Sequence, residues 1–270
     1  MDIEGDDGVD AEGESEMAFF LRALRSQGVL MPIVSCILGT IFLLFNEPII
    51  SDHLIQMGMS PDYIGFTFAA SCLCYAIAAP IVGYLTKHFS KESLTLFAYV
   101  FSSLALLIQG PSKLLGLPET SIHLTLSGFI ILGAMEAFIF VPLMPILIEA
   151  LLKEEQRKLG ASKKGGADIH PLSEEEMSDK ASSIFQCAQS VGCILGPVLG
   201  GFLNDLVRFQ STCDIMAITC FGYACLLYHG MQKEGKMNEY IAGVVRWAKR
   251  VMRKTSTKTD KPLNNSSASI

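Results

Sequence analysis

The chain has 270 residues, of which 50% are hydrophobic and 18% charged, with a formal net charge of -6 and a mean hydropathy of +0.39. Soluble domains carry about 25% charged residues, so this composition argues against an ordinary soluble domain, and nothing in it indicates a nucleic-acid partner. The apolar residues form blocks of roughly twenty, the length that an α-helix needs to cross about 30 Å of hydrocarbon. We therefore expect an all-α membrane protein with six transmembrane helices.

The amino-terminal residues do not resemble a targeting peptide. Residues 1–16 are acidic and contain no Lys or Arg, so they lack both the basic start of a secretory signal and the arginines of a mitochondrial transit peptide. Their composition predicts a disordered tail. Residues 17–27 carry apolar residues at helical spacing beside Arg22 and Arg25, which predicts a short interfacial helix.

A six-helix transmembrane domain is expected over residues 28–231. The six spans are predicted at about 29–50, 63–86, 93–109, 122–148, 181–207 and 213–231. The charged segment 153–180 is too polar for lipid and is predicted to be a mobile cytosolic linker. Residues 232–254 are predicted to form a basic amphipathic helix on the membrane surface, or else a soluble helix docked on protein, and residues 255–270 a disordered tail.

The distribution of basic residues predicts the orientation of the chain. If there are six spans, the two termini, the second loop and the linker lie on one side of the membrane, and they carry 19 of the 21 Lys and Arg residues. Basic loops stay in the cytoplasm, so both termini are predicted to be cytoplasmic. The sequons at Asn264 and Asn265 are then expected to be unglycosylated.

The sequence shows no catalytic arrangement. It has no metal-ligand cluster, no P-loop and no nucleophile motif, so we expect no enzyme activity, no metal and no cofactor. The eight cysteines fall in or beside apolar blocks without CxxC spacing, which favours small buried hydrophobic residues over disulfides or ligands.

Two acids are the candidate binding residues. Glu136 lies in the middle of the fourth span, where an ionisable group costs about 2.5–3.5 kcal/mol on insertion scales and usually faces a cavity or a partner. Glu47 lies beside Pro48 near the end of the first span. Such acids suit the binding of a cationic amine, or of a proton whose release is coupled to substrate movement. The alternatives are a protonated Glu136 hydrogen-bonded within the bundle and a solvated Glu47 at a helix end.

Glycines and prolines mark the fifth and fourth spans. Gly192, Gly196 and Gly200 recur at four-residue steps, beside Pro197 and Gly201, and this spacing predicts a groove that lets another helix approach closely. In the fourth span, Pro142 and Pro145 predict a kinked helix. We expect both sets to act in helix packing and gating.

Several of these segments resemble the major facilitator superfamily of secondary transporters. Gly83 through Lys91 resembles its cytoplasmic G-x-L-x-D-R loop motif, with Lys87 in place of the expected acid. The segment 192–201 is similar to the G-x3-G-P-x2-G-G signature of antiporters. Asn46-Glu47-Pro48 and the segment 141–146 look like segments of the vesicular amine transporters, the group that the chain most resembles.

The resemblance implies one half of a major-facilitator bundle, the carboxy-terminal six helices, over roughly residues 29–230. It carries the amine-binding role of a family acid over to Glu47, whereas Phe140 takes the place of the family's tenth-helix acid and Glu136 lies one turn away. Because such transporters bind substrate between two halves, we expect a homodimer, a separate partner that supplies the other half, or a truncated gene product.

Two hypotheses about function follow from this. The first is a secondary active transporter or half-transporter for a small organic cation, such as a monoamine or polyamine, coupled to protons through Glu47 and Glu136. The second is a non-transporting membrane subunit or scaffold derived from a transporter half. The sequence predicts a multi-pass membrane location but does not distinguish a vesicular membrane from the plasma membrane.

Overall fold

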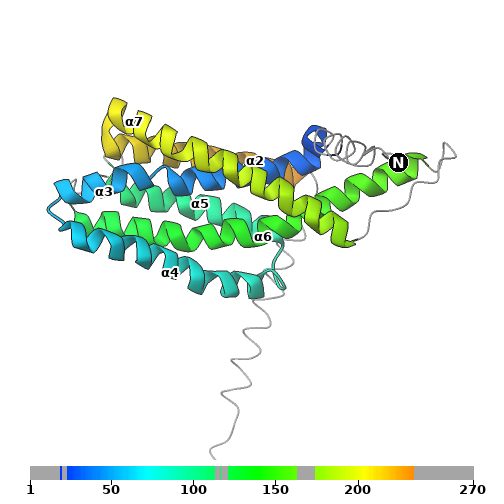
Figure 1. The fold of residues 1–270 in the computed structure, drawn as a ribbon, viewed down its shortest axis with the longest axis horizontal. Coiled ribbons are helices and arrows are strands. Elements are labelled where there is room, and N and C mark those ends of the chain that lie inside the picture. Colours follow the sequence, from blue (N-terminus) through cyan, green and yellow to red (C-terminus); the bar gives the residue numbers. More distant parts are fainter. Residues whose placement is uncertain (1–18, 20–22, 113–115, 117–120, 163–173, 234–270) are drawn as a thin grey trace, which may run out of the picture.

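The computed structural model of the chain describes residues 19, 23–112, 116, 121–162 and 174–233. These residues form an elongated helical bundle and include no strand (Figure 1). Its helices are α2 (Gln27–Leu44), α3 (Glu47–Gln56), α4 (Pro61–Leu85), α5 (Lys91–Gln109), α6 (Ile122–Ser162) and α7 (Glu174–Lys233). The predicted tails, residues 17, 18 and 20–22 of the interfacial helix, and nearly all of the amphipathic helix 232–254 lie outside the described residues.

Five helical stretches in the described part of the chain are long and apolar enough to cross a membrane. They are Gly28–Gln56, Pro61–Leu85, Lys91–Gln109, Ile122–Arg157 and Glu175–Gln232. The all-α membrane fold predicted from the sequence is thereby confirmed. The last stretch has 58 residues, more than twice what a bilayer needs, and it contains both the fifth and the sixth predicted spans.

A single residue divides α7 into two antiparallel arms. Arg208 has φ 69° and ψ 163°, a backbone conformation that a helix does not contain, and residues on both sides of it are helical. The chain reverses there, so that the arm 174–207 and the arm 209–233 lie alongside each other (Figure 1). The loop predicted between residues 207 and 213 is therefore reduced to a reversal at Arg208.

The first span also differs from its prediction, because the helix resumes after a break. Two turn residues, Phe45 and Asn46, separate α2 from α3, and Pro48 occupies the first turn of α3, where its missing N–H is tolerated. Ile49, Ile50 and Leu54 of α3 are buried. Residues 51–56, predicted as loop, are therefore helical because their apolar face continues the core.

The predicted linker 153–180 is helical at both of its ends. α6 continues to Ser162 and α7 begins at Glu174, while residues 163–173 lie outside the described part of the chain. Charge excludes a segment from hydrocarbon but does not prevent it from forming a helix in water, so the helices extend beyond the membrane spans predicted from composition.

Consecutive membrane stretches run in opposite directions, and the first arm of α7 packs closely on α2 through small residues. Gly192, Gly196 and Gly200 all face α2 from the first arm of α7. A Cβ at Gly196 would lie 3.1 Å from the Cβ of Leu44, and a Cβ at Gly200 would overlap the carbonyl group of Phe45. Gly201, by contrast, has nothing within 4 Å of a Cβ. The half-buried Pro197 lies within the same arm.

The second arm of α7 is held by hydrogen bonds to polar and aromatic side chains. The Ser103 hydroxyl of α5 donates to the carbonyl of Ala217 at 3.0 Å. The Tyr99 hydroxyl donates to the carbonyl of Ser35 in α2 at 2.6 Å, and the hydroxyls of Ser35 and Tyr223 are 2.6 Å apart. These bonds join α2, α5 and the second arm. They also explain why α5 is the least hydrophobic of the five stretches, because its polar side chains face protein.

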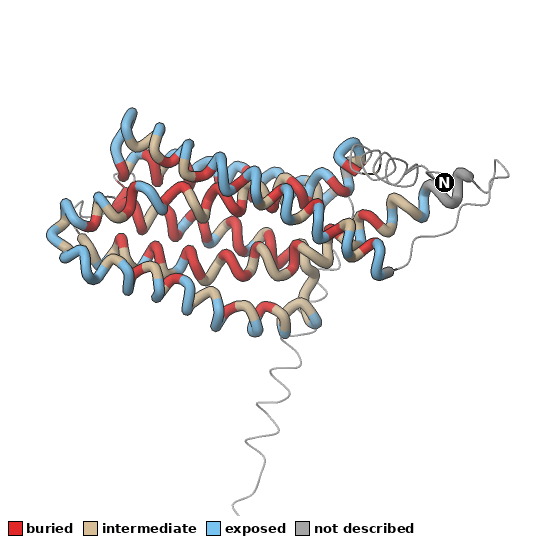
Figure 2. The backbone as a smooth tube through the Cα atoms, in the orientation of Figure 1, coloured by how far each residue is buried: buried red, intermediate tan, exposed pale blue. Residues whose placement is uncertain are grey.

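Exposed residues run along α4 and α7 (Figure 2), and many of them have large apolar side chains. On α4 the exposed side chains include Phe66, Leu73 and Ile77, which are 57–71% exposed. On α7 they include Ile194 and Phe202, at 68% and 61%. Large apolar side chains in such number are stable in hydrocarbon and not in water.

The glycine contact predicts opposite effects for two neighbouring substitutions. Gly200→Ala places a methyl group against the backbone of Phe45, so α2 and α7 must separate, and we expect a loss of about 1–3 kcal/mol of stability. Gly201→Ala meets no atom and is expected to be neutral or slightly stabilising. Thermal unfolding of the purified variants in detergent measures both. Equal midpoints for the two variants would show that this contact does not hold the bundle together.

Candidate functional site

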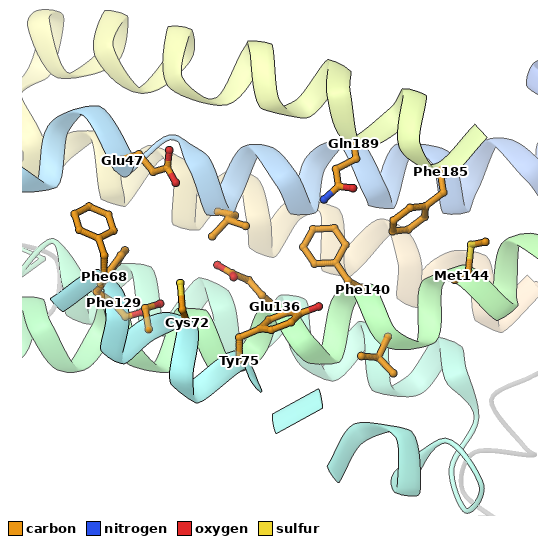
Figure 3. Close-up of a pocket in the computed structure, with 13 residues that line it drawn as sticks. Glu47, Phe68, Cys72, Tyr75, Phe129, Glu136, Phe140, Met144, Phe185 and Gln189 are labelled. Carbon is orange, nitrogen blue, oxygen red and sulfur yellow. The ribbon is translucent and has the colours of Figure 1, made fainter. Parts of the chain in front are cut away.

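A cavity of about 540 Å³ opens between four helical segments of the bundle (Figure 3). Its lining residues come from α2 and the start of α3, from α4, from α6 and from the first arm of α7. They are Leu43, Glu47, Phe68, Ser71, Cys72, Tyr75, Phe129, Glu136, Phe140, Val141, Met144, Phe185 and Gln189. Both acids singled out in the sequence therefore line one cavity.

Glu136 lies in the middle of α6 and is 6% exposed. Its Oε1 atom is buried and has no hydrogen-bond partner among the described residues. A buried polar atom without a partner costs about 1–3 kcal/mol, and more if the group is charged. The carboxyl group thus occupies a place that weakens the fold, which is typical of groups kept for function.

Glu47 is the first residue of α3 and is exposed. The residue before it, Asn46, is completely buried, and its side-chain Nδ2 donates to Oε1 of Gln109 in α5 at 3.4 Å. This bond fixes the break between α2 and α3 against the neighbouring helix. The break turns the start of α3 so that the Glu47 side chain lies at one end of the cavity (Figure 3).

Aromatic rings form much of the remaining lining. Phe68 of α4 and Phe129 of α6 meet edge to face with ring centroids 5.4 Å apart. Phe140 of α6 and Phe185 of α7 do the same at 6.3 Å. Figure 3 shows the Glu136 carboxyl group between these two pairs, with Tyr75 beside it. Ring faces attract cations, so carboxyl groups among aromatic rings form a site suited to a cation with an apolar body.

Phe140 and Glu136 lie one turn apart on α6, and both line the cavity. The two side chains therefore face the same space. Of the two prolines in α6, Pro142 is buried and Pro145 half-buried, and the helix continues through both.

The residues of the predicted loop motif lie away from the cavity lining. Gly83, near the end of α4, has nothing within 4 Å of a Cβ, and Lys87 is exposed. Lys91, at the start of α5, forms an ion pair with Glu149 of α6. This pair joins the two helices at the end of the bundle where α2 begins.

Several lining residues have no signal in the sequence. Ser71, Cys72 and Tyr75 belong to α4, in which polar and apolar residues alternate without a marked face, and Gln189 is one of several polar residues in α7. Only the packing of α4 and α7 against the other helices brings these residues to the cavity lining. Among the described residues, no group of three or more His, Cys, Asp and Glu side chains could hold a metal ion.

Comparison with known proteins gives a family match over most of the chain. The family model described as Major Facilitator Superfamily matches residues 18–255. The human MFS-type transporter SLC18B1 is 21% identical over 207 residues, which cover 73% of this chain and 42% of that protein. Its mouse counterpart is 25% identical over 170 residues, covering 62% of this chain and 33% of the mouse protein. No solved structure matches.

The unpaired carboxyl group predicts a gain of stability when it is removed. Replacing the Glu136 side chain by the similarly shaped methionine, Glu136→Met, is expected to stabilise the fold by about 1–3 kcal/mol. Glu47→Met, at an exposed position, is expected to change stability by less than about 0.5 kcal/mol. Thermal unfolding in detergent compares the two. A Glu136→Met protein less stable than the wild type would show that the carboxyl group has a stabilising partner.

Proposed function

Because this chain belongs to the major facilitator superfamily, we propose that it acts as a secondary active transporter, or as one half of one, for a small organic cation. The observation that carries the proposal is the convergence of Glu47 and Glu136 on one aromatic-lined cavity. Amines and polyamines fit this chemistry, because an ammonium group pairs with carboxylates and its apolar body packs against rings.

The position of Glu136 supports coupling to protons. A carboxyl group in a poorly solvated place is stable when it is neutralised, either by a bound proton or by a cationic partner. A proton and a substrate cation would therefore compete for Glu136, and the release of one would accompany the binding of the other. Competition of this kind is what proton-coupled exchange requires.

We further propose that a second six-helix unit completes the cavity. The chain spans less than half the length of the curated relatives that it matches. α4 and the first arm of α7 both line the cavity but do not pack closely on each other, so a facing unit placed between them would close it. A second copy of this chain or a separate six-helix partner would give the arrangement in which substrate binds between two halves.

The orientation proposed for the chain follows from its charges. The bundle end that carries the starts of α2, α5 and α7 is the end at which the predicted basic loops lie, so we propose that it faces the cytoplasm. The two termini would then also be cytoplasmic, in a vesicular or plasma membrane.

Transport measurements with three variants test the function. In proteoliposomes with an imposed pH gradient, we expect Glu136→Gln and Glu47→Gln each to reduce the uptake of a radiolabelled organic amine at least tenfold. Asp62→Asn, at an exposed acid of α4 that does not line the cavity, is expected to retain uptake within about twofold. If well-folded wild-type protein transports no amine, the non-transporting membrane subunit becomes the better description.

Glycosylation tests the orientation. Asn264 and Asn265 lie in sequons through Ser266 and Ser267, and cytoplasmic sequons do not meet oligosaccharyltransferase. Protein expressed in eukaryotic cells is therefore expected to show no change in mass after glycosidase treatment. A shift at these sites would place the carboxy terminus on the opposite side.

A further inference from the structure

A second cavity lies at the end of the bundle where α3 ends and α7 reverses. Its volume is about 470 Å³, and it shares no lining residue with the cavity that contains Glu47 and Glu136. Figure 1 shows α3 and the reversal of α7 at this same end, and the two helices are in contact. We call this cavity the end pocket. Its polar lining residues are Asp52, His53, Gln56, Asn204, Arg208 and Gln210.

The end pocket lies at the boundary of the membrane. Gln56 is the last residue of the first membrane stretch, and the next stretch begins five residues later, at Pro61. Arg208 lies between the predicted fifth and sixth spans, where the chain turns back into the membrane. Both walls of the end pocket therefore leave the hydrocarbon here, at the depth of the phospholipid headgroups.

The end pocket contains one acid and one base. Asp52 of α3 and Arg208 of α7 are both exposed, and neither forms an ion pair with another described residue. A guanidinium group binds two phosphate oxygens at once through parallel N–H bonds, and a carboxylate pairs with an ammonium group. A pocket with one charge of each sign therefore suits a ligand that also carries one charge of each sign.

His53 gives a second indication that the end pocket holds a polar ligand. Its ring is stacked on the buried ring of Phe209, with centroids 4.0 Å apart and planes inclined by 16°. Its Nε2 atom is buried and has no hydrogen-bond partner among the described residues. A buried polar atom without a partner lowers stability. A polar ligand in the end pocket would supply that partner to a ring that is already fixed in position.

The backbone of Arg208 gives a third indication. Its φ of 69° and ψ of 163° belong to a region that glycine adopts readily and other residues only under strain. A glycine would therefore reverse the chain at lower cost, but it has no side chain to line the end pocket. The arginine at this position lowers stability and supplies a positive charge, which is typical of a residue kept for binding.

Exposed apolar side chains border the end pocket. Ile55 directly precedes Gln56, Val207 directly precedes Arg208, and both are exposed. A phospholipid would place its headgroup in the end pocket and its acyl chains against such side chains. A small soluble ligand would cover the polar part alone. The combination of opposite charges, headgroup depth and an apolar border therefore favours a lipid.

We propose that the end pocket binds the headgroup of a zwitterionic phospholipid. The phosphate lies against Arg208, the ammonium group lies at Asp52, and the acyl chains extend along the bundle toward the membrane centre. The bound lipid joins α3 to the reversal of α7 and stabilises the bundle at this end. This site is separate from the central cavity, so the inference does not depend on transport.

Thermal unfolding of the full-length protein tests the proposal. Protein purified and delipidated in detergent receives dioleoyl-phosphatidylethanolamine or dioleoyl-phosphatidylglycerol, which have the same acyl chains, at equal molar ratios. We expect the zwitterionic lipid to raise the midpoint by at least about 5 °C and the anionic lipid by less than half as much, because only the former matches both charges. Equal shifts with the two lipids would overturn the proposal.

Three variants assign the effect to the end pocket. Asp52→Asn removes the negative charge, so the two lipids are expected to stabilise this variant equally. Arg208→Gly removes the positive charge and relieves the backbone, so without lipid it should unfold no earlier than the wild type, while both lipids lose at least half of their effect. Asp205→Asn, at an exposed acid nearby that does not line the end pocket, should keep the wild-type preference.

Two results with these variants would contradict the proposal. The first is a wild-type lipid preference in Asp52→Asn, and the second is full stabilisation of Arg208→Gly by the zwitterionic lipid. If the glycine variant is less stable than the wild type without lipid, Arg208→Gln gives the same test with the side-chain length retained.

Soluble ligands distinguish a lipid from a free phosphate compound. Glycerophosphoethanolamine and inorganic phosphate, each at a tenfold molar excess over the lipid concentration, are expected to shift the midpoint by less than about 1 °C, because they bring no acyl chains. A shift by glycerophosphoethanolamine as large as that by the lipid would show that the end pocket takes a free ligand, and the phospholipid would be the wrong occupant.

Discussion

The contact between α2 and the first arm of α7 is the interaction on which the rest of the structure depends. It brings backbone against backbone, because Gly192, Gly196 and Gly200 remove the side chains that would keep the two helices apart. At membrane depth there is little hydrophobic force between helices, so van der Waals contact of this kind holds them together. α2 leads directly into Glu47, and α7 carries Phe185 and Gln189, so the same contact fixes two walls of the cavity.

The bundle also contains Glu136, a buried residue that lowers its folding stability. Glu136 has a buried oxygen without a partner among the described residues, whereas an apolar side chain at this position would leave no polar atom unpaired. The site combines this carboxyl group with aromatic rings and a second, exposed acid. Such a combination lowers the stability of the fold, but it allows the protein to bind positive charge in a place from which bulk water is mostly excluded.

The sequence predicted those features that depend on one residue or one helix. Mid-membrane position singled out Glu136, and four-residue spacing singled out the glycines. The break before Glu47 was missed, because it depends on Asn46 reaching Gln109 in another helix. The contributions of Ser71, Cys72 and Tyr75 were missed for the same reason, since only packing reveals which side of α4 faces α6. Hydropathy also ended the fourth span before α6 ends and began the fifth span after α7 begins, because it detects segments suited to lipid and not helix as such.

The reversal of α7 at Arg208 has a mechanical consequence. The two arms are joined by a single non-helical residue with positive φ. A displacement of either arm is therefore transmitted directly to the other. The second arm is tied to α5 and α2 by Ser103, Tyr99 and Tyr223. The helices α2, α5 and α7 are therefore linked to one another through the two arms of α7, and α6 packs on α5 as well, whereas α4 packs mainly on α6.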